Sequence, residues 1–228
     1  MIDLIVNLPL RQKILLTLAL EIFTETDIRL QDHLFNFQTG QWLVDPLAPG
    51  PRFWFYTFPK LLLFPLGAFL LVSCINAKLR AKLALQKSQA LYLFCCLAAV
   101  PLLAGAGKNI THVHCPSELV RYGGTEQYAK VIARDRPPWK KVPPHCFPAG
   151  HASGGFALLA LYFVRRRRVW LIPGLTVGWT MGLYQMFKGA HFLSHTLLTM
   201  FLAVTVSAAL SPILRSRATW LRPEPEKN

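Results

Sequence analysis

Residues 146–158 read Cys-Phe-Pro-Ala-Gly-His-Ala-Ser-Gly-Gly-Phe-Ala-Leu, and this stretch decides how the rest of the chain is interpreted. A proline and two small residues place His151 at the start of an apolar helical run. Backbone N–H groups, the positive end of the helix dipole and an imidazole then converge on one point. The stretch therefore predicts a helix start that binds phosphate.

A second stretch with similar features lies forty residues further on, where residues 188–195 read Lys-Gly-Ala-His-Phe-Leu-Ser-His. His191 and His195 are four residues apart at the head of another apolar segment, a spacing that puts both on one face of a helix. Two histidine-bearing helix starts predict one shared site.

The composition excludes an ordinary soluble domain. Of the 228 residues, 53% are hydrophobic and only 16% are charged, so we expect a single-domain integral membrane protein over residues 1–228. The 25 Lys and Arg against 11 Asp and Glu give a formal charge of +14. Most of this charge lies in short runs between apolar segments, which leaves no soluble basic face for nucleic acid. These runs are Lys78–Lys87, Arg165–Arg168 and Arg215–Arg222.

The apolar segments predict an all-α fold with six transmembrane helices, since a helix needs about 20 apolar residues to cross a bilayer. Polar loops are expected over Thr24–Phe58 and Lys108–Phe147, and a polar tail over 211–228. The motif-bearing half is then 108–210. The expected spans are Ile14–Thr26, Phe58–Ile75, Ala90–Gly107, Ala149–Val164, Val169–Phe187 and Phe192–Leu210.

The basic runs orient these spans, because cytoplasmic loops carry an excess of Lys and Arg. A six-span count puts all the basic runs on one side together with both termini, which are therefore expected to be cytoplasmic. The same count puts both histidine stretches on the opposite side.

The five cysteines do not form a disulfide scaffold, but Cys115 and Cys146 flank one polar loop and could pair if that loop faces an oxidising compartment. A zinc site on this loop is disfavoured, because the spacing of its candidate ligands fits no usual pattern. Its candidate ligands are His112, His114, Cys115, His145 and Cys146. No metal and no cofactor are therefore expected.

Histidine can fill two roles in phosphoryl transfer. A neutral imidazole can attack phosphorus and form a phosphohistidine, while a second, protonated imidazole supplies the proton of the leaving group. Cations and N–H dipoles must surround the phosphate oxygens. Basic candidates for this role are Lys130, Arg134, Arg136, Lys140, Lys141 and Lys188.

With these residues, the sequence resembles the phosphatidic acid phosphatase type 2 superfamily, from Lys108 to the last span. That family has three ordered motifs: a lysine followed at a fixed distance by Arg-Pro, then Pro-Ser-Gly-His, then Ser-Arg, five residues, His, three residues and Asp. Arg136-Pro137 resembles the end of the first motif and Pro148–His151 the second. His191 with His195 resembles the third.

The resemblance implies a role for each matched residue. His191 would be the nucleophile and His151 the acid, while Lys130, Arg136, Gly150 and Lys188 would hold the phosphate oxygens. The family's phosphatases need no metal.

Four positions depart from the family pattern: Ala129 stands where the first motif has its lysine, Ala149 where the second has serine, Gln185 where the third has arginine, and His195 where it has aspartate. His195 could still accept a hydrogen bond from His191 and so select its tautomer.

The expected function is a metal-independent membrane phosphatase acting on a lipid phosphate or diphosphate, of the undecaprenyl diphosphate, lipid A or phosphatidylglycerophosphate class. The resemblance favours a bacterial inner membrane with the active site facing the periplasm. Two alternatives remain open: a phosphotransferase that moves phosphate to lipid A, and a non-catalytic lipid-binding or transport protein on a phosphatase scaffold. The expected partners are the lipid substrate and the bilayer, with no nucleic acid; the oligomeric state stays undetermined.

Overall fold

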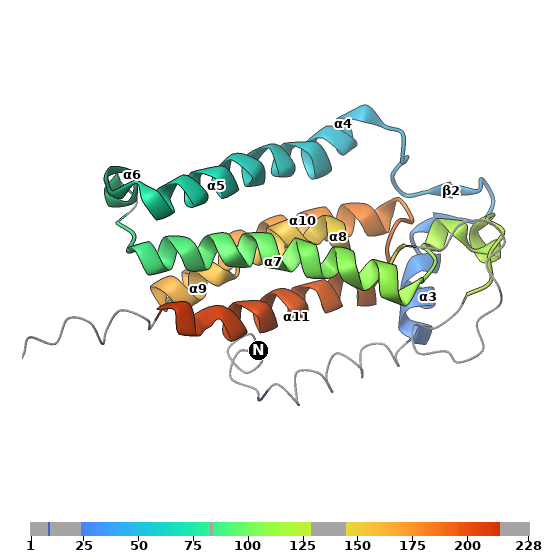
Figure 1. The fold of residues 1–228 in the computed structure, drawn as a ribbon. Coiled ribbons are helices and arrows are strands. Elements are labelled where there is room, and N and C mark those ends of the chain that lie inside the picture. The colour runs from blue at the N-terminus through green and yellow to red at the C-terminus, as the bar shows by residue number, and fades with distance from the viewer. Residues whose placement is uncertain (1–8, 10–23, 83, 129–144, 215–228) are drawn as a thin grey trace, which may run out of the picture.

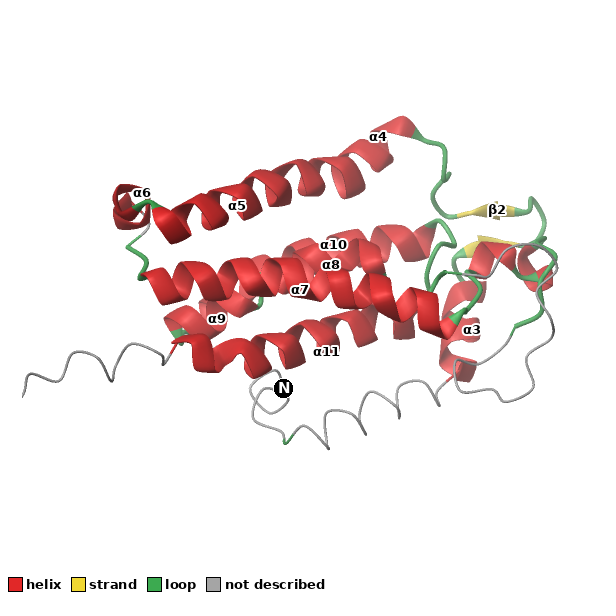
Figure 2. Ribbon diagram, viewed as in Figure 1, coloured by secondary structure: helices red, strands yellow, loops and turns green. Residues whose placement is uncertain are grey.

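The protein is described by a computed structural model that covers residue 9 and residues 24–82, 84–128 and 145–214. It is mostly helical (Figures 1 and 2). The principal helices are α5 (Phe58–Ile75), α7 (Lys87–Thr111), α8 (Gly150–Ala157), α9 (Ala160–Arg165), α10 (Ile172–Phe187) and α11 (Leu193–Leu210). The shorter elements are α3 (Thr24–Asp32), β1 (Phe35–Asn36), β2 (Gln41–Trp42), α4 (Pro49–Arg52), the π-helical turn η1 (Phe53–Thr57), α6 (Ala77–Lys82), and the 3₁₀ turns η2 (Pro116–Glu118), η3 (Val120–Tyr122), η4 (Arg168–Leu171) and η5 (Ser211–Leu214).

In the part of the chain that the structure describes, three helical segments are long and apolar enough to cross a membrane: Pro49–Ile75, Lys87–Glu118 and Leu193–Leu214. The expected count of six spans is not confirmed. Helix α10 has 16 residues and α8 has 8, so neither reaches the length of a full span by itself. Most of the first expected span lies outside the described residues, and its last residues belong to α3. Of the expected tail, only η5 is described.

The expected fourth span is divided into two helices. The Leu158 N–H donates to the Gly155 carbonyl at 3.1 Å and the Leu159 N–H to the Phe156 carbonyl at 2.9 Å, so the chain tightens into a 3₁₀-like turn between α8 and α9. Neither Gly nor Pro stands at Leu158 or Leu159, the two residues between the helices. Leu159 is in close contact with Gly174 of α10 instead, which indicates that helix packing determines where the break falls.

A glycine stripe on α10 allows close helix packing. Gly174, Gly178 and Gly182 recur every four residues along one face. A Cβ atom at Gly178 would overlap the ring of Phe156 in α8, and one at Gly182 would overlap the side chain of Thr196 in α11. Small residues let helix backbones approach closely in membranes, and α10 packs against α8 more extensively than any other pair of elements.

The bundle has two distinct ends (Figure 1). At one end lie α6, the end of α9 and the start of α7, which carry the described basic runs. At the other end lie the start of α8, the end of α10 and the start of α11. His151, His191 and His195 belong to this end, with His191 in the loop between α10 and α11. The structure therefore separates the basic runs from the histidine stretches.

The expected Thr24–Phe58 loop is partly ordered into secondary structure. It forms α3 and an antiparallel hairpin in which Phe35 pairs with Trp42. The ring centroids of Phe35 and Tyr122 are 5.3 Å apart, and those of Trp42 and Tyr122 are 5.1 Å apart. We call residues 24–48 and 113–128 the outer cap; it covers the histidine end of the bundle (Figure 2).

The glycine contact between α8 and α10 predicts a stability effect. A Cβ at Gly155 would lie 2.6 Å from the backbone nitrogen of Gly178, which cannot move without shifting α10. We expect Gly155→Ala to lower the free energy of unfolding by about 1–3 kcal/mol. Gly105→Ala in α7 is the matched control, because a Cβ there meets nothing within 4 Å. Thermal unfolding in detergent should separate the two variants; equal shifts would contradict the close contact.

Candidate active site

The centre of the candidate site is a direct contact between two histidines. Nδ1 of His151, the second residue of α8, lies 3.1 Å from Nε2 of His191 in the loop between α10 and α11. His191 is only 1% exposed. The structure therefore brings together the two histidine stretches that the sequence places at separate helix starts.

The other ring nitrogen of His191 faces a disulfide. Cys115 and Cys146 are bridged, with Cα atoms 5.2 Å apart, and Nδ1 of His191 lies 3.3 Å from the sulfur of Cys146. Half-cystine sulfur has no proton and acts as a weak acceptor. In the tautomer that carries its proton on Nδ1, His191 donates to this sulfur and keeps the lone pair of Nε2 on the side of His151.

His195 does not make the hydrogen bond to His191 that the sequence suggested. The two ring centroids are 5.8 Å apart, and Nδ1 of His195 has no hydrogen-bond partner among the described residues. The His195 ring packs instead against the rings of Phe147 and Phe192, with centroid separations of 5.0 Å and 5.3 Å. The His195 carbonyl accepts the N–H of Ala149 at 3.3 Å, so this residue joins α11 to the start of α8.

Burial determines the charge state of His191. It lowers the pKa of the imidazole well below its usual range, and the neighbouring His151 and Lys108 lower that pKa further. A neutral imidazole with an available lone pair is the form that can attack phosphorus.

Three lysines surround the histidine pair. The charges of Lys60, Lys108 and Lys188 all act on His151. Within the described residues, none of the three forms an ion pair with a carboxylate. Burial lowers the pKa of Lys188, and the nearby Arg52 lowers it further. This concentration of positive charge is suited to an anion.

Lys108 is the lysine most directly connected with the helix start. Its Cε would lie 3.1 Å and its Nζ 3.4 Å from a Cβ at Gly150, so the side chain lies over the first residue of α8. Ala149 precedes that residue and offers no side-chain cap. The first N–H groups of α8 and the Lys108 ammonium are therefore adjacent donors for the same oxygens.

Tyr56 connects Lys60 with the site. The Lys60 ammonium donates to the Tyr56 hydroxyl at 2.6 Å, and the ring of Tyr56 lies 5.2 Å from that of His151. The Lys188 ammonium lies 5.1 Å from the ring centroid of Tyr184 and 5.9 Å from that of Tyr56. The two tyrosines thus hold lysines of α5 and of the α10 end beside one histidine.

Several of these residues were missed by the sequence reasoning. Lys130 and Arg136, the expected phosphate ligands, lie outside the described residues. A usable signal was present for Lys108: it stands seven residues before Cys115-Pro116, the same spacing that the first family motif has between its lysine and Arg-Pro. No comparable pattern marks Lys60 or Tyr56.

The outer cap holds the loop that carries His191. Gly189, at φ +72°, lies directly against the ring of Trp42, which leaves no room for a Cβ. The side-chain amide of Gln31 donates to the Met186 carbonyl at 2.8 Å. The carboxylate of Asp27, a buried acid, accepts the N–H of Ser194 at 3.0 Å and so caps the start of α11.

Gln185, at the position of the third motif's arginine, is fully buried, and its side-chain amide has no hydrogen-bond partner in the described part of the chain. The backbone carbonyl of Gln185 accepts the N–H of Ala190 at 2.8 Å, which supports the loop before His191. The cation nearest in sequence is Lys188, already placed beside the histidine pair.

One group of side chains has the geometry of a metal site. The ligand atoms of Cys146, His191 and His195 lie within 4.8 Å of one another. The bridge to Cys115 removes the thiolate that a metal would need, so this group does not fit a resident metal ion in the oxidised protein.

Comparison with known protein families gives one match. The family model described as the PAP2 superfamily matches residues 89–218, more than half of the chain and all three histidines. A search of the curated proteins found no match, and a search of the solved structures found none either. With that match and a histidine pair surrounded by lysines, the chain belongs to the PAP2 superfamily, whose members are generally membrane-associated phosphatases.

Proposed function

We propose that this protein is a membrane lipid phosphatase that removes phosphate from a lipid phosphate or diphosphate through a phosphohistidine intermediate. The observation that carries the proposal is the 3.1 Å contact between Nδ1 of His151 and Nε2 of His191 beside three lysines. A nucleophile and a proton donor then meet where positive charge gathers.

In the first half-reaction, Nε2 of His191 attacks phosphorus and the bond from phosphorus to the lipid oxygen breaks. His151 gives its proton to that oxygen. The bound phosphate replaces the contact between the two rings. Its negative charge offsets the three lysines and favours the protonated form of His151 that this step requires.

In the second half-reaction, water attacks the phosphohistidine. His151 now accepts a proton from the water, the N–P bond breaks, and phosphate leaves with both histidines restored. Lys108 and the first N–H groups of α8 neutralise the equatorial oxygens in both steps.

The substrate class follows from the position of the site. His151 and His191 lie at one end of an apolar helix bundle, so the hydrocarbon part of a lipid can stay in the bilayer while its phosphate reaches the site. Undecaprenyl diphosphate, lipid A, phosphatidylglycerophosphate and phosphatidic acid all have this form. We place the site at the periplasmic face of a bacterial inner membrane and both termini in the cytoplasm, because the described basic runs lie at the opposite end.

The first prediction concerns the nucleophile. His191→Ala should reduce phosphate release from these four lipids by at least about 10³-fold, because it removes the proposed nucleophile. Purified protein in detergent with a chelator present gives the measurement, and an acid-labile labelled phosphoenzyme should vanish in parallel. The matched control is His33→Ala, an exposed histidine of the outer cap.

The same assay separates the alternatives. Label passed to added lipid A instead of water would indicate a phosphotransferase. Headgroup binding that survives His191→Ala, without release or transfer by the unmodified protein, would indicate a non-catalytic lipid-binding protein and overturn the proposal.

The second prediction concerns Lys108. Lys108→Met keeps the length of the side chain but removes its charge, and it should lower kcat/KM by about 10- to 100-fold, the loss of one charge-assisted hydrogen bond of about 1.5–3 kcal/mol. Lys87→Met at the opposite end of the same helix should leave kcat/KM unchanged. Equal effects of the two variants would show that Lys108 does not bind the phosphate.

The third prediction concerns the disulfide. Reduction of Cys115–Cys146 frees two segments that contact the His191 loop, since Ser117 donates to the Gly189 carbonyl at 2.9 Å and Cys146 contacts His191. We expect a soluble phosphine reductant to lower phosphate release several-fold and to lower the melting temperature. Cys115→Ser should start at the reduced level and not respond to the reductant. A native protein that keeps full activity after reduction, verified by mass, would exclude this support.

A further inference from the structure

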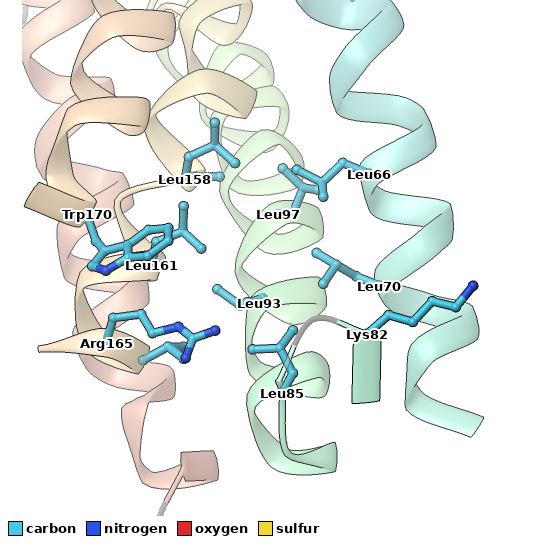
Figure 3. Close-up of a pocket in the computed structure, with 12 residues that line it drawn as sticks. Leu66, Leu70, Lys82, Leu85, Leu93, Leu97, Leu158, Leu161, Arg165 and Trp170 are labelled. Atoms are coloured by element: carbon cyan, nitrogen blue, oxygen red, sulfur yellow. The ribbon is translucent and has the colours of Figure 1, made fainter. Parts of the chain in front are cut away.

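A buried set of metal-ligand atoms lies beside the proposed nucleophile, and the proposed reaction does not use it as a set. It consists of Cys146, His191 and His195, whose exposed fractions are 0%, 1% and 3%. One ligand atom of each residue lies within 4.8 Å of the other two. By contrast, the apolar groove of about 400 Å³ between α5, α7 and the α8–α9 segment (Figure 3) has no histidine, cysteine or acid among its described lining residues.

The spacing of these three residues suits a tetrahedral zinc ion. Zinc binds thiolate sulfur at about 2.3 Å and imidazole nitrogen at about 2.0 Å, so neighbouring ligand atoms lie roughly 3.3–3.6 Å apart. Nδ1 of His191 lies 3.3 Å from the sulfur of Cys146. Nδ1 of His195 is buried without a hydrogen-bond partner among the described residues, so turning this ring toward a metal breaks no described hydrogen bond of that nitrogen.

The disulfide decides whether these residues bind a metal. In the bridged protein the sulfur of Cys146 is bonded to Cys115 and carries no negative charge. The charges of Lys108 and Lys188 act on His191 and oppose a dication beside it. A thiolate supplies both the negative charge and the soft ligand that zinc prefers. Metal binding is therefore confined to the reduced protein.

A reductant reaches the bridge from the side of Cys115, which is half-buried, whereas Cys146 is fully buried. One sulfur of a dithiol attacks the sulfur of Cys115, the S–S bond breaks, and Cys146 leaves as a thiolate beside His191. The second sulfur of the dithiol then displaces Cys115. The dithiol is oxidised to its own disulfide and loses two protons, of which one ends on Cys115 and one is released.

We propose that reduction of the Cys115–Cys146 bridge creates an inhibitory zinc site, in which the Cys146 thiolate, His191 and His195 bind Zn²⁺ and water completes the tetrahedron.

The inhibition follows from the tautomer of His191. In the proposed reaction Nδ1 carries the proton and Nε2 attacks phosphorus. A metal bound to Nδ1 uses the lone pair of that nitrogen, so the proton of the neutral ring lies on Nε2 and the attacking lone pair is lost. The inhibition rests on the proposed function, whereas the binding of metal does not.

The first measurement is metal binding by Cys115→Ser, which keeps the Cys146 thiol without a reductant. The full chain in detergent is titrated with Co²⁺, which reports its ligands by absorption. We expect one Co²⁺ per chain, with the visible bands of tetrahedral cobalt and a sulfur-to-cobalt charge-transfer band, all removed by added Zn²⁺. The bridged native protein should show none of these bands. Native protein reduced with a phosphine and desalted without oxygen should show them, which keeps the test valid if Cys115→Ser fails to fold.

Further changes in the Cys115→Ser background assign the ligands. Adding Cys146→Ser should abolish the charge-transfer band. Adding His195→Ala should raise the dissociation constant of Co²⁺ by at least about 100-fold, because losing a ligand costs more than losing an outer hydrogen-bond partner. His114→Ala is the matched control, since this histidine lies next to Cys115 and its Nδ1 contacts Glu118 at 3.0 Å instead. It should leave Co²⁺ binding unchanged.

Phosphate release tests the consequence of binding. Zn²⁺ should lower release by Cys115→Ser at least about tenfold, a chelator should restore it, and the bridged native protein should not respond. Absence of the charge-transfer band, or equal losses of Co²⁺ binding in the His195→Ala and His114→Ala variants, would overturn the site. Full phosphate release with Zn²⁺ bound would overturn the inhibition. A chain that binds Co²⁺ but releases no phosphate would contradict the proposed function and leave the metal site standing, so the two failures are distinguishable.

Discussion

The close approach of α8 and α10 is the constraint on which the candidate site depends. Gly155 and Gly178 let the two backbones meet, and no side chain larger than hydrogen fits between them. His151 lies four residues before Gly155, which puts it on the same face of α8. The glycine contact therefore directs His151 toward the end of α10, and the chain needs only the short segment from Lys188 to His191 to bring the second imidazole within 3.1 Å.

That short segment is held from outside the bundle. The outer cap contacts it through Trp42 on Gly189 and Gln31 on Met186, while the Val44 N–H donates to the Phe187 carbonyl at 3.1 Å. The ion pair between Arg121 and Asp32, at 2.6 Å, joins the two segments of the outer cap, and the guanidinium lowers the pKa of Asp32. A loop with few backbone partners of its own thus obtains them from segments more than 140 residues earlier in the chain, which fixes the position of His191.

The sequence predicted those parts of the fold and site that depend on local pattern. The expected span Phe58–Ile75 coincides with α5, and Phe192–Leu210 with α11 to within one residue, because apolar length alone defines them. The sequence singles out His151 and His191 because each stands near the start of an apolar helical run. What depends on packing was not predictable: the turn at Leu158 has no breaker residue, and Lys60 reaches His151 only through the three-dimensional placement of Tyr56. The group that contacts Nδ1 of His191 was not predictable either. The motif spacing points to His195, but the atom in contact is the sulfur of Cys146.

Tyrosine side chains beside the three lysines allow the site to hold its positive charge. Three ammonium groups near buried imidazoles repel one another, and burial already lowers the pKa of Lys188. Here part of the repulsion is relieved by tyrosine, because the Tyr56 hydroxyl accepts from Lys60 and its ring faces the ammonium at 3.8 Å. Tyrosine oxygens and π-faces stabilise a cation without neutralising it, whereas a carboxylate would pair with it and compete with the substrate. The site therefore keeps its positive charge available for the phosphate of the proposed substrate.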